Sequence, residues 1–201
     1  MMISTPTEAE ALRAEIAALA ARMIAEDGAD YGSAKRRAAK QLLGNQKIRG
    51  DVLPDNSQIE LEVREYNALF FGDSQPQRLL ALREIAVDVM QKLEKFNPYL
   101  VGAVFNGTAN RHSDVHLHLY TDNSKEVAIF LLNMDIQYEV SETTNKRNET
   151  LETLSFMYQN EGVHLLIHSH DDLRASPRAD RASLSAVQLL IEQSRANINH
   201  E

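Results

Sequence analysis

The spacing of apolar residues divides the chain into a helical first half and a mixed second half. Up to Phe96 apolar residues recur every three or four positions, as on the buried face of an amphipathic helix. After Asn97–Pro98 the period becomes two, which is typical of strands with one buried face. We therefore expect an α+β chain with two domains: a helical region over 1–97, and over 98–201 a mixed sheet flanked by helices.

The individual elements follow from the same pattern. Helical stripes run through Leu12 to Met23, Ile59 to Phe70 and Leu79 to Phe96, and a basic helix over 33–43 should end at Gly44, since glycine is favoured there. The second half predicts helices over 124–134 and 182–196, a hairpin turn at 145–148, and strands over 99–105, 114–120, 136–141, 152–158 and 163–169. In the strand over 114–120, Asp114, His116 and His118 share one face and the apolar residues the other.

Composition narrows the class of protein. The 201 residues are 43% apolar and 25% charged, which suits a folded chain with a buried core. No apolar run is long enough for a membrane span, and Glu8, Glu10 and Glu15 stand where a secretory signal needs a basic start, so we expect a soluble, cytoplasmic protein. Because there is no cysteine, a metal would have to be held by His, Asp and Glu.

Charge is distributed unevenly. The net charge is −8, yet residues 33–50 contain no acid and include Lys35, Arg36, Arg37 and Lys40. This basic segment could contact the phosphates of RNA or a protein partner, or it could dock on the acidic remainder of the chain. Charge runs more often have the second role.

Residues 101–121, VGAVFNGTANRHSDVHLHLYT, concentrate the polar chemistry. We interpret them as an apolar strand, a Gly107–Thr108 turn, a short connection and an alternating strand. A glycine directly after a strand lets backbone amides approach a phosphate, and the Thr108 hydroxyl can donate to it. Two alternatives stay open: an ordinary strand-ending turn at Gly107–Thr108, and a turn cap at Ser113–Asp114.

This order of features resembles the nucleotidyltransferase superfamily related to DNA polymerase beta. Gly107 and Thr108 match its Gly-Ser turn, Arg111 matches a basic residue of the connection, and Ser113–Asp114 matches the approach to its first metal-binding acid. With its helical first half, the chain is also similar to a group of small proteobacterial proteins. The resemblance implies that Gly107, Thr108, Arg111 and Ser113 bind a nucleoside triphosphate, and that Asp114 is catalytic and binds metal.

The resemblance breaks at the other two acids of the family. Those positions are His116 and His164 in this chain. The family's reaction uses two magnesium ions, which prefer carboxylate oxygen, whereas an Asp114–His116–His164 set suits a transition metal better. His118 is in phase with His116, and His168 and His170 are in phase with His164. The alternative is a solvent-facing sheet surface that binds no metal.

Three functions follow. The favoured one is a degenerate module that binds a nucleotide or partner and has lost two-metal chemistry. The alternative is a divergent enzyme that transfers a nucleoside monophosphate from a triphosphate to an acceptor through an Asp/His metal site. The third is a metal-sensing or structural protein using only its histidines. If the motif is assigned correctly, the strands over 114–120 and 163–169 are neighbours, and His116 and His164 project from the same face.

Overall fold

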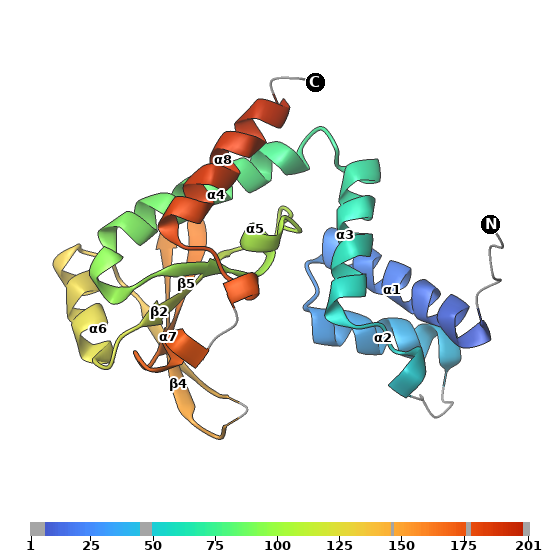
Figure 1. The fold of residues 1–201 in the computed structure, drawn as a ribbon, viewed down its shortest axis with the longest axis horizontal. Helices are drawn as coiled ribbons and strands as arrows, with labels where there is room; N and C mark the ends of the chain where they lie inside the picture. The colour runs from blue at the N-terminus through green and yellow to red at the C-terminus, as the bar shows by residue number, and fades with distance from the viewer. Residues whose placement is uncertain (1–6, 45–49, 146, 176–177, 199–201) are drawn as a thin grey trace. The chain divides into compact units, whose positions relative to one another are not determined.

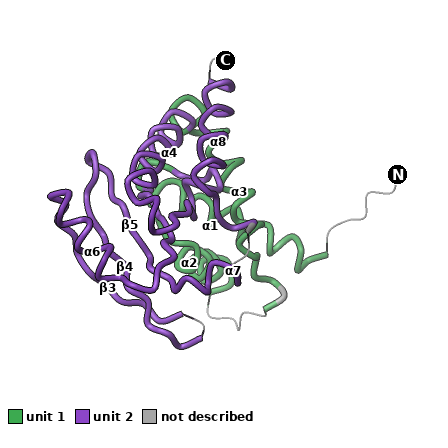
Figure 2. Tube along the Cα trace, turned by 60° about the vertical axis from the view of Figure 1, so that its left-hand side comes forward, with its two compact units in different colours: residues 1–75, 110–112 green, residues 76–109, 113–201 purple. Residues whose placement is uncertain are grey.

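The computed structural model describes residues 7–44, 50–145, 147–175 and 178–198, and the chain forms two compact units (Figure 1, Figure 2). Unit 1 comprises residues 1–75 and 110–112, and unit 2 comprises residues 76–109 and 113–201. The change from helices to strands falls near Pro98 as expected, whereas the compact units divide between Gln75 and Pro76.

Unit 1 is a helical bundle. It contains α1 (Glu8–Asp27), α2 (Tyr31–Leu43), the 3-10 turn η1 (Gly50–Val52) and α3 (Asn56–Phe70). Its core is made of small and branched side chains: Ile16, Ala17, Ala20, Ala21, Ile24, Ala34, Ala38, Ala39, Ile59 and Val63. Capping boxes at Thr7 and Asp55 satisfy backbone amides at the starts of α1 and α3, and α2 ends at Gly44 as predicted.

Unit 2 is a five-stranded mixed sheet with helices. In chain order its elements are α4 (Gln75–Lys92), η2 (Glu94–Phe96), β1 (Tyr99–Val101), α5 (Gly102–Asn106), β2 (Val115–Tyr120), α6 (Ser124–Asn133), β3 (Glu139–Thr144), β4 (Thr150–Tyr158), β5 (Glu161–His168), α7 (Asp172–Ala175), η3 (Arg178–Asp180) and α8 (Leu184–Ile198). The strand order is β1-β2-β5-β4-β3, with β2 and β5 parallel and the other neighbours antiparallel. The predicted α+β class is confirmed.

Helices cover one face of this sheet. Apolar residues of β2, β4 and β5 point to that face and form a single core with the apolar stripes of α4, α6 and α8. Figure 1 shows α4 and α8 side by side, and the ion pair between Glu84 and Arg195 joins them. This shared core explains why α4 belongs to unit 2 rather than to the helical bundle.

The predicted strand over 99–105 is wrong beyond Val101. There the chain turns at Gly102, whose φ is +71°, and residues Gly102–Asn106 form the short helix α5. A positive φ is readily adopted by glycine, so the strand ends where glycine allows the turn. The glycine that directly follows a strand is therefore Gly102, and Gly107 ends a helix.

The β4–β5 hairpin fixes the register of the sheet. Gln159 and Asn160 form its two-residue turn, and both have positive φ, the backbone that suits the twist of a tight hairpin. Ser155 therefore lies directly opposite His164.

Among the helices of the described ranges, none combines the length and apolar character needed to cross a membrane.

Candidate functional site

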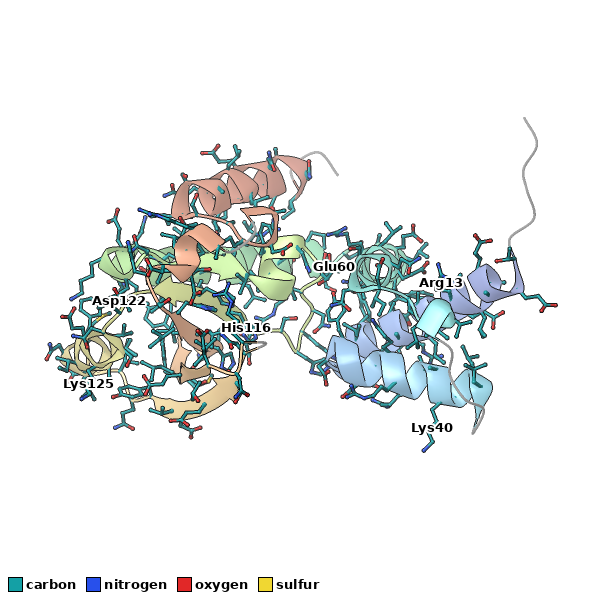
Figure 3. All side chains as sticks on the ribbon, turned by 60° about the horizontal axis from the view of Figure 1, so that its bottom comes forward. Arg13, Lys40, Glu60, His116, Asp122 and Lys125 are labelled. Carbon is teal, nitrogen blue, oxygen red and sulfur yellow. The ribbon has the colours of Figure 1, made fainter. Side chains whose placement is uncertain are left out.

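Four imidazoles pair across the face of the sheet that the helices leave open. His116 on β2 is level with His164 on β5, and their rings stack with centroids 4.7 Å apart. His118 and His168 form a second pair, with centroids 4.5 Å apart. Figure 3 labels His116 on this sheet. The prediction that the two strands are neighbours with His116 and His164 on one face is confirmed.

His164 is held from both sides. Its Nε2 lies 3.0 Å from Oδ2 of Asp114, and its Nδ1 lies 2.8 Å from Oγ of Ser155. An ionised carboxylate only accepts hydrogen bonds, so Nε2 carries the proton that points at Asp114. In the neutral ring Nδ1 is then an acceptor, and the Ser155 hydroxyl donates to it. Sequence analysis did not identify Ser155.

Asp114 is positioned by the residues around it. It immediately precedes β2, and a Cβ placed on Gly162 would lie 2.6 Å from its carboxyl carbon, so glycine makes room for the carboxylate. Arg78 on α4 forms an ion pair with Glu161 and donates to the Ser113 carbonyl at 3.4 Å. The hydrogen bond to Glu161 is the main cause that raises the pKa of Arg78, and Asp114 adds to it.

A hollow of about 600 Å³ lies over the open face of the sheet. Its lining contains four hydroxyl side chains, three imidazoles, and backbone or apolar groups: Ser141, Thr143, Thr153 and Ser155; His116, His118 and His164; Val101, Gly102, Leu117 and Leu166. No Lys, Arg, Asp or Glu belongs to this described lining. The hollow is therefore rich in neutral hydrogen-bonding groups.

Three histidines of the open face, His116, His118 and His168, have a lowered pKa. Burial lowers the pKa of His118 to about 4, with smaller contributions from His168, His116 and Arg181. The pKa of His116 is also lowered, first by the surrounding protein atoms, although part of the ring is exposed, and then by His164. Burial likewise lowers the pKa of His168. At neutral pH these three rings add no positive charge to the face.

The residues predicted to bind a nucleotide are not brought together as expected. Gly107 ends α5, and Thr108 is only 1% exposed, with its amide and hydroxyl both bonded to Oδ1 of Asn106. The expected phosphate cradle requires a strand that runs directly into this turn, but β1 ends at Val101 and α5 lies between it and Gly107. Gly102, which does follow β1, borders the hollow.

Arg111 and Ser113 have other contacts. Arg111 belongs to unit 1, where its Nη2 donates to the carbonyl of Glu26 at the end of α1. Ser113 belongs to unit 2 and gives its carbonyl to Arg78. Nucleotide binding by Arg111 or Ser113 stays a prediction.

The described residues do not fit a two-magnesium centre. No group of three or more His, Asp or Glu side chains within the described ranges has the arrangement of a metal site. Asp114 is the one acid of the predicted set, and both ring nitrogens of His164 are already in hydrogen bonds. A metal ion on His164 would have to displace Asp114 or Ser155. Binding of a single transition-metal ion at Asp114, His116 and His164 stays a prediction.

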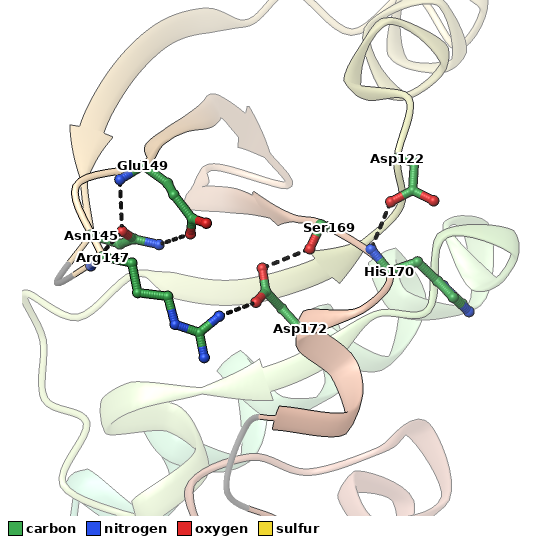
Figure 4. Close-up of polar contacts among 7 residues, drawn as sticks. All are labelled: Asp122, Asn145, Arg147, Glu149, Ser169, His170 and Asp172. Atoms are coloured by element: carbon green, nitrogen blue, oxygen red, sulfur yellow. Dashed lines mark hydrogen bonds and ion pairs between the residues drawn. The ribbon is translucent and has the colours of Figure 1, made fainter.

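A second cleft, of about 500 Å³, lies where parallel strands β2 and β5 end. Figure 4 shows three segments meeting there: His170 donates its backbone N–H to Asp122, while Asp172 accepts from Ser169 and from Arg147. His170 therefore lies beyond β5, away from the paired imidazoles. The acids of this cleft are partly engaged in local hydrogen bonds and an ion pair.

Comparison with known proteins does not assign the chain to a family. No family model and no curated protein matches the chain. One solved structure, described as the structure of the GLD-2/RNP-8 complex, aligns with a TM-score of 0.28 and 19% identity, and the alignment covers 50% of this chain and 43% of that one. A superposition this partial does not define a common fold. The function has to be inferred from the geometry of the chain itself.

Proposed function

We propose that unit 2 is a nucleotidyltransferase-like module that binds a nucleoside or nucleotide on its open sheet face and has lost two-metal chemistry. The proposal depends on one observation: His116 and His164 lie opposite each other on β2 and β5, and His164 is hydrogen-bonded to Asp114. These are the positions where the resembled family has three acids, and here two of them are neutral or hydrogen-bonded rings. Two adjacent Mg²⁺ ions would have too little negative charge between them.

The lining of the hollow indicates which part of a nucleotide it would hold. A triphosphate is usually bound by Arg, Lys, metal ions or backbone amides, and the described lining contains no Arg or Lys. Hydroxyls such as Thr153 and ring faces such as His116 suit a base and a ribose. We therefore expect affinity to come from the nucleoside and to change little with the number of phosphates.

Isothermal titration of the full chain with adenosine, guanosine, cytidine, uridine and their triphosphates tests this proposal. One nucleoside should bind without Mg²⁺, and its triphosphate should bind within about tenfold of it, a difference of 1.4 kcal/mol. His116→Ala and Thr153→Val should weaken binding, whereas the control His170→Ala, outside the hollow, should not.

Incubation with labelled triphosphates and a panel of divalent ions separates binding from transfer. We expect no Mg²⁺-dependent release of pyrophosphate. Brisk Mg²⁺-dependent transfer of a nucleoside monophosphate, unaffected by Asp114→Ala, would overturn both the site and the loss of two-metal chemistry.

A further inference from the structure

We propose that Ser155 is a nucleophile for acyl transfer, with His164 as its general base and Asp114 as the residue that positions the base. Ser155 Oγ lies 2.8 Å from His164 Nδ1, and His164 Nε2 lies 3.0 Å from Asp114 Oδ2. A nucleophile bonded to a base that is itself oriented by a carboxylate is the arrangement used to activate a serine hydroxyl. The proposal does not rest on nucleotide binding, although both functions would use the same hollow.

The direction of the hydrogen bonds is the one that catalysis needs. Because Asp114 accepts from Nε2, the free lone pair of the ring is on Nδ1, facing the Ser155 hydroxyl. The roles of the two ring nitrogens are reversed compared with serine proteases, but the order hydroxyl, base, carboxylate is the same. The hairpin turn at Gln159–Asn160 holds Ser155 opposite His164, so two paired strands fix the geometry.

The proposed reaction is the hydrolysis of an ester in two halves, through an acyl-serine. Ser155 Oγ bonds to the ester carbonyl carbon while its proton moves to His164 Nδ1. The bond from that carbon to the alcohol oxygen then breaks, and His164 returns the proton to the departing alcohol. In the second half, water gives a proton to His164 as its oxygen bonds to the acyl carbon. The bond from that carbon to Ser155 Oγ then breaks, and His164 returns the proton to Ser155 Oγ. The products are an alcohol, a carboxylic acid and the restored Ser155 hydroxyl. The Asp114 carboxylate faces the imidazolium that forms in each half.

The surroundings of Ser155 define the class of substrate. The hollow beside it has no Lys or Arg in its described lining to pair with an anionic substrate, so we infer an uncharged ester. Ser141 and Thr153 line the same hollow, and we expect their hydroxyls to donate to the oxygen that becomes negative during attack.

A covalent serine probe tests the proposal on the full chain. An alkyl fluorophosphonate should form one adduct, detected by intact-protein mass spectrometry and located by peptide mapping at Ser155. Ser155→Ala should abolish labelling, and His164→Gln should slow it by about 10²-fold or more. The matched control Ser185→Ala, an exposed serine on α8, should label like the wild type.

The role of Asp114 needs a conservative variant. Asp114→Asn should slow labelling, and Asp114→Glu, which retains a carboxylate, should restore part of the rate.

Circular-dichroism melting identifies any variant that does not fold, and Ser155→Ala, on an open face, is then the deciding variant. The proposal is overturned by the absence of an adduct in folded wild-type protein, by an adduct that persists in Ser155→Ala, or by equal labelling of folded His164→Gln. Hydrolysis of p-nitrophenyl acetate that vanishes in Ser155→Ala would further support it. Nucleoside titrations are measured separately, so the proposed nucleotide-binding function can fail while labelling succeeds.

Discussion

His116 and His164 occupy the same level of two parallel strands, and their rings stack 4.7 Å apart beside the Asp114 carboxylate. A pair of carboxylates at this separation would repel each other unless a cation lay between them. Two imidazoles, one with a lowered pKa, can lie in contact without a metal. Histidines at these two positions therefore allow the face to form without a metal ion.

Acids at positions 116 and 164 should create a magnesium site beside Asp114. The double variant His116→Asp with His164→Asp would give three neighbouring carboxylates with Asp114, and we expect Mg²⁺ to bind more tightly and to raise its melting temperature. Each single variant should gain less, because the ions are held jointly. Calorimetric titration with Mg²⁺ checks this. A folded double variant that binds no more Mg²⁺ than the wild type would contradict the site assignment.

Acid should destabilise unit 2 through His118. Its folded pKa is about 4 and its unfolded value is near 6.5, so between these values the unfolded chain binds more protons. The free energy of unfolding should therefore fall as the pH is lowered through this window, by about 1–2 kcal/mol from this residue between pH 7 and 5. Urea titrations at both pH values measure it. His118→Asn should reduce the fall, and the control His170→Asn should leave it unchanged; the same fall in all three proteins would contradict this prediction.

Gly162→Ala should displace Asp114 without removing its carboxylate. The new Cβ would lie 2.6 Å from the Asp114 carboxyl carbon, which is too close, so the hydrogen bond from His164 should be lost. The ¹⁵N and ¹H shifts of the His164 ring report this bond directly, and fluorophosphonate labelling should slow. Gly50→Ala, where a Cβ meets nothing within 4 Å, is the control. Unchanged ring shifts in the Gly162→Ala variant would show that Asp114 does not depend on this glycine.

Arg83 should be important for the stability of unit 2. Its side chain donates to the carbonyls of Val104 and Phe105 and to Ser194, and the residue is 6% exposed. Burial lowers the pKa of Arg83. Arg83→Met leaves these acceptors without their donor, and we expect a loss of about 2–3 kcal/mol in the free energy of unfolding.

The exposed ion pair Arg195–Glu84 provides the control for that measurement. It joins the same two helices, α4 and α8, and Arg195→Met should cost less than about 1 kcal/mol. Chemical denaturation of both variants gives the comparison. Equal losses in the free energy of unfolding would contradict the prediction that the buried Arg83 contributes more to stability than the exposed ion pair.

The basic residues of α2 should bind nucleic acid weakly or not at all. Arg37 lies 3.7 Å from Asp27, Lys35 contacts Asn56 and Arg36 contacts Ser33, while Lys40 extends away from the helix (Figure 3). Binding of single-stranded RNA to these residues would weaken by about 0.7 log unit per log unit of salt for each phosphate contacted. Fluorescence anisotropy at several salt concentrations measures the slope. Tight binding with a slope near 3, lost when all four residues are changed to Gln, would establish an RNA partner.

Alternation along each strand predicted which of its own histidines share a face, because a period of two assigns each residue of β2 and β5 to a side. That the two strands are neighbours, with His116 and His164 on one face, was predicted from the motif and not from alternation. The same reasoning gave no warning at residues 99–105, because β1 has three residues and α5 has five. Neither is long enough to show a period, and the turn between them depends on the positive φ of Gly102.

Two contacts, one of Ser155 in the site and one of the predicted site residue Arg111, depend on tertiary structure that the spacing of apolar residues does not indicate. Ser155 is an ordinary hydroxyl within a strand, and its importance comes only from lying opposite His164. A two-residue turn at Gln159–Asn160 would have given this register, since Ser155 and His164 are equally far from it. Arg111 contacts a carbonyl 85 residues away, and nothing in its local sequence indicates that partner.

The return of residues 110–112 to unit 1 limits how the protein can be divided. The Asn110 side chain donates to the carbonyl of Ile24, and His112 lies so close to Gly28 that a Cβ there would be 2.7 Å away. Cutting the chain between Gln75 and Pro76 would leave the bundle without this segment and the sheet with a loose loop. Only Ser113 separates His112 from Asp114, so any division of the chain that keeps residues 110–112 with the bundle has to cut within two residues of the Asp114 carboxylate.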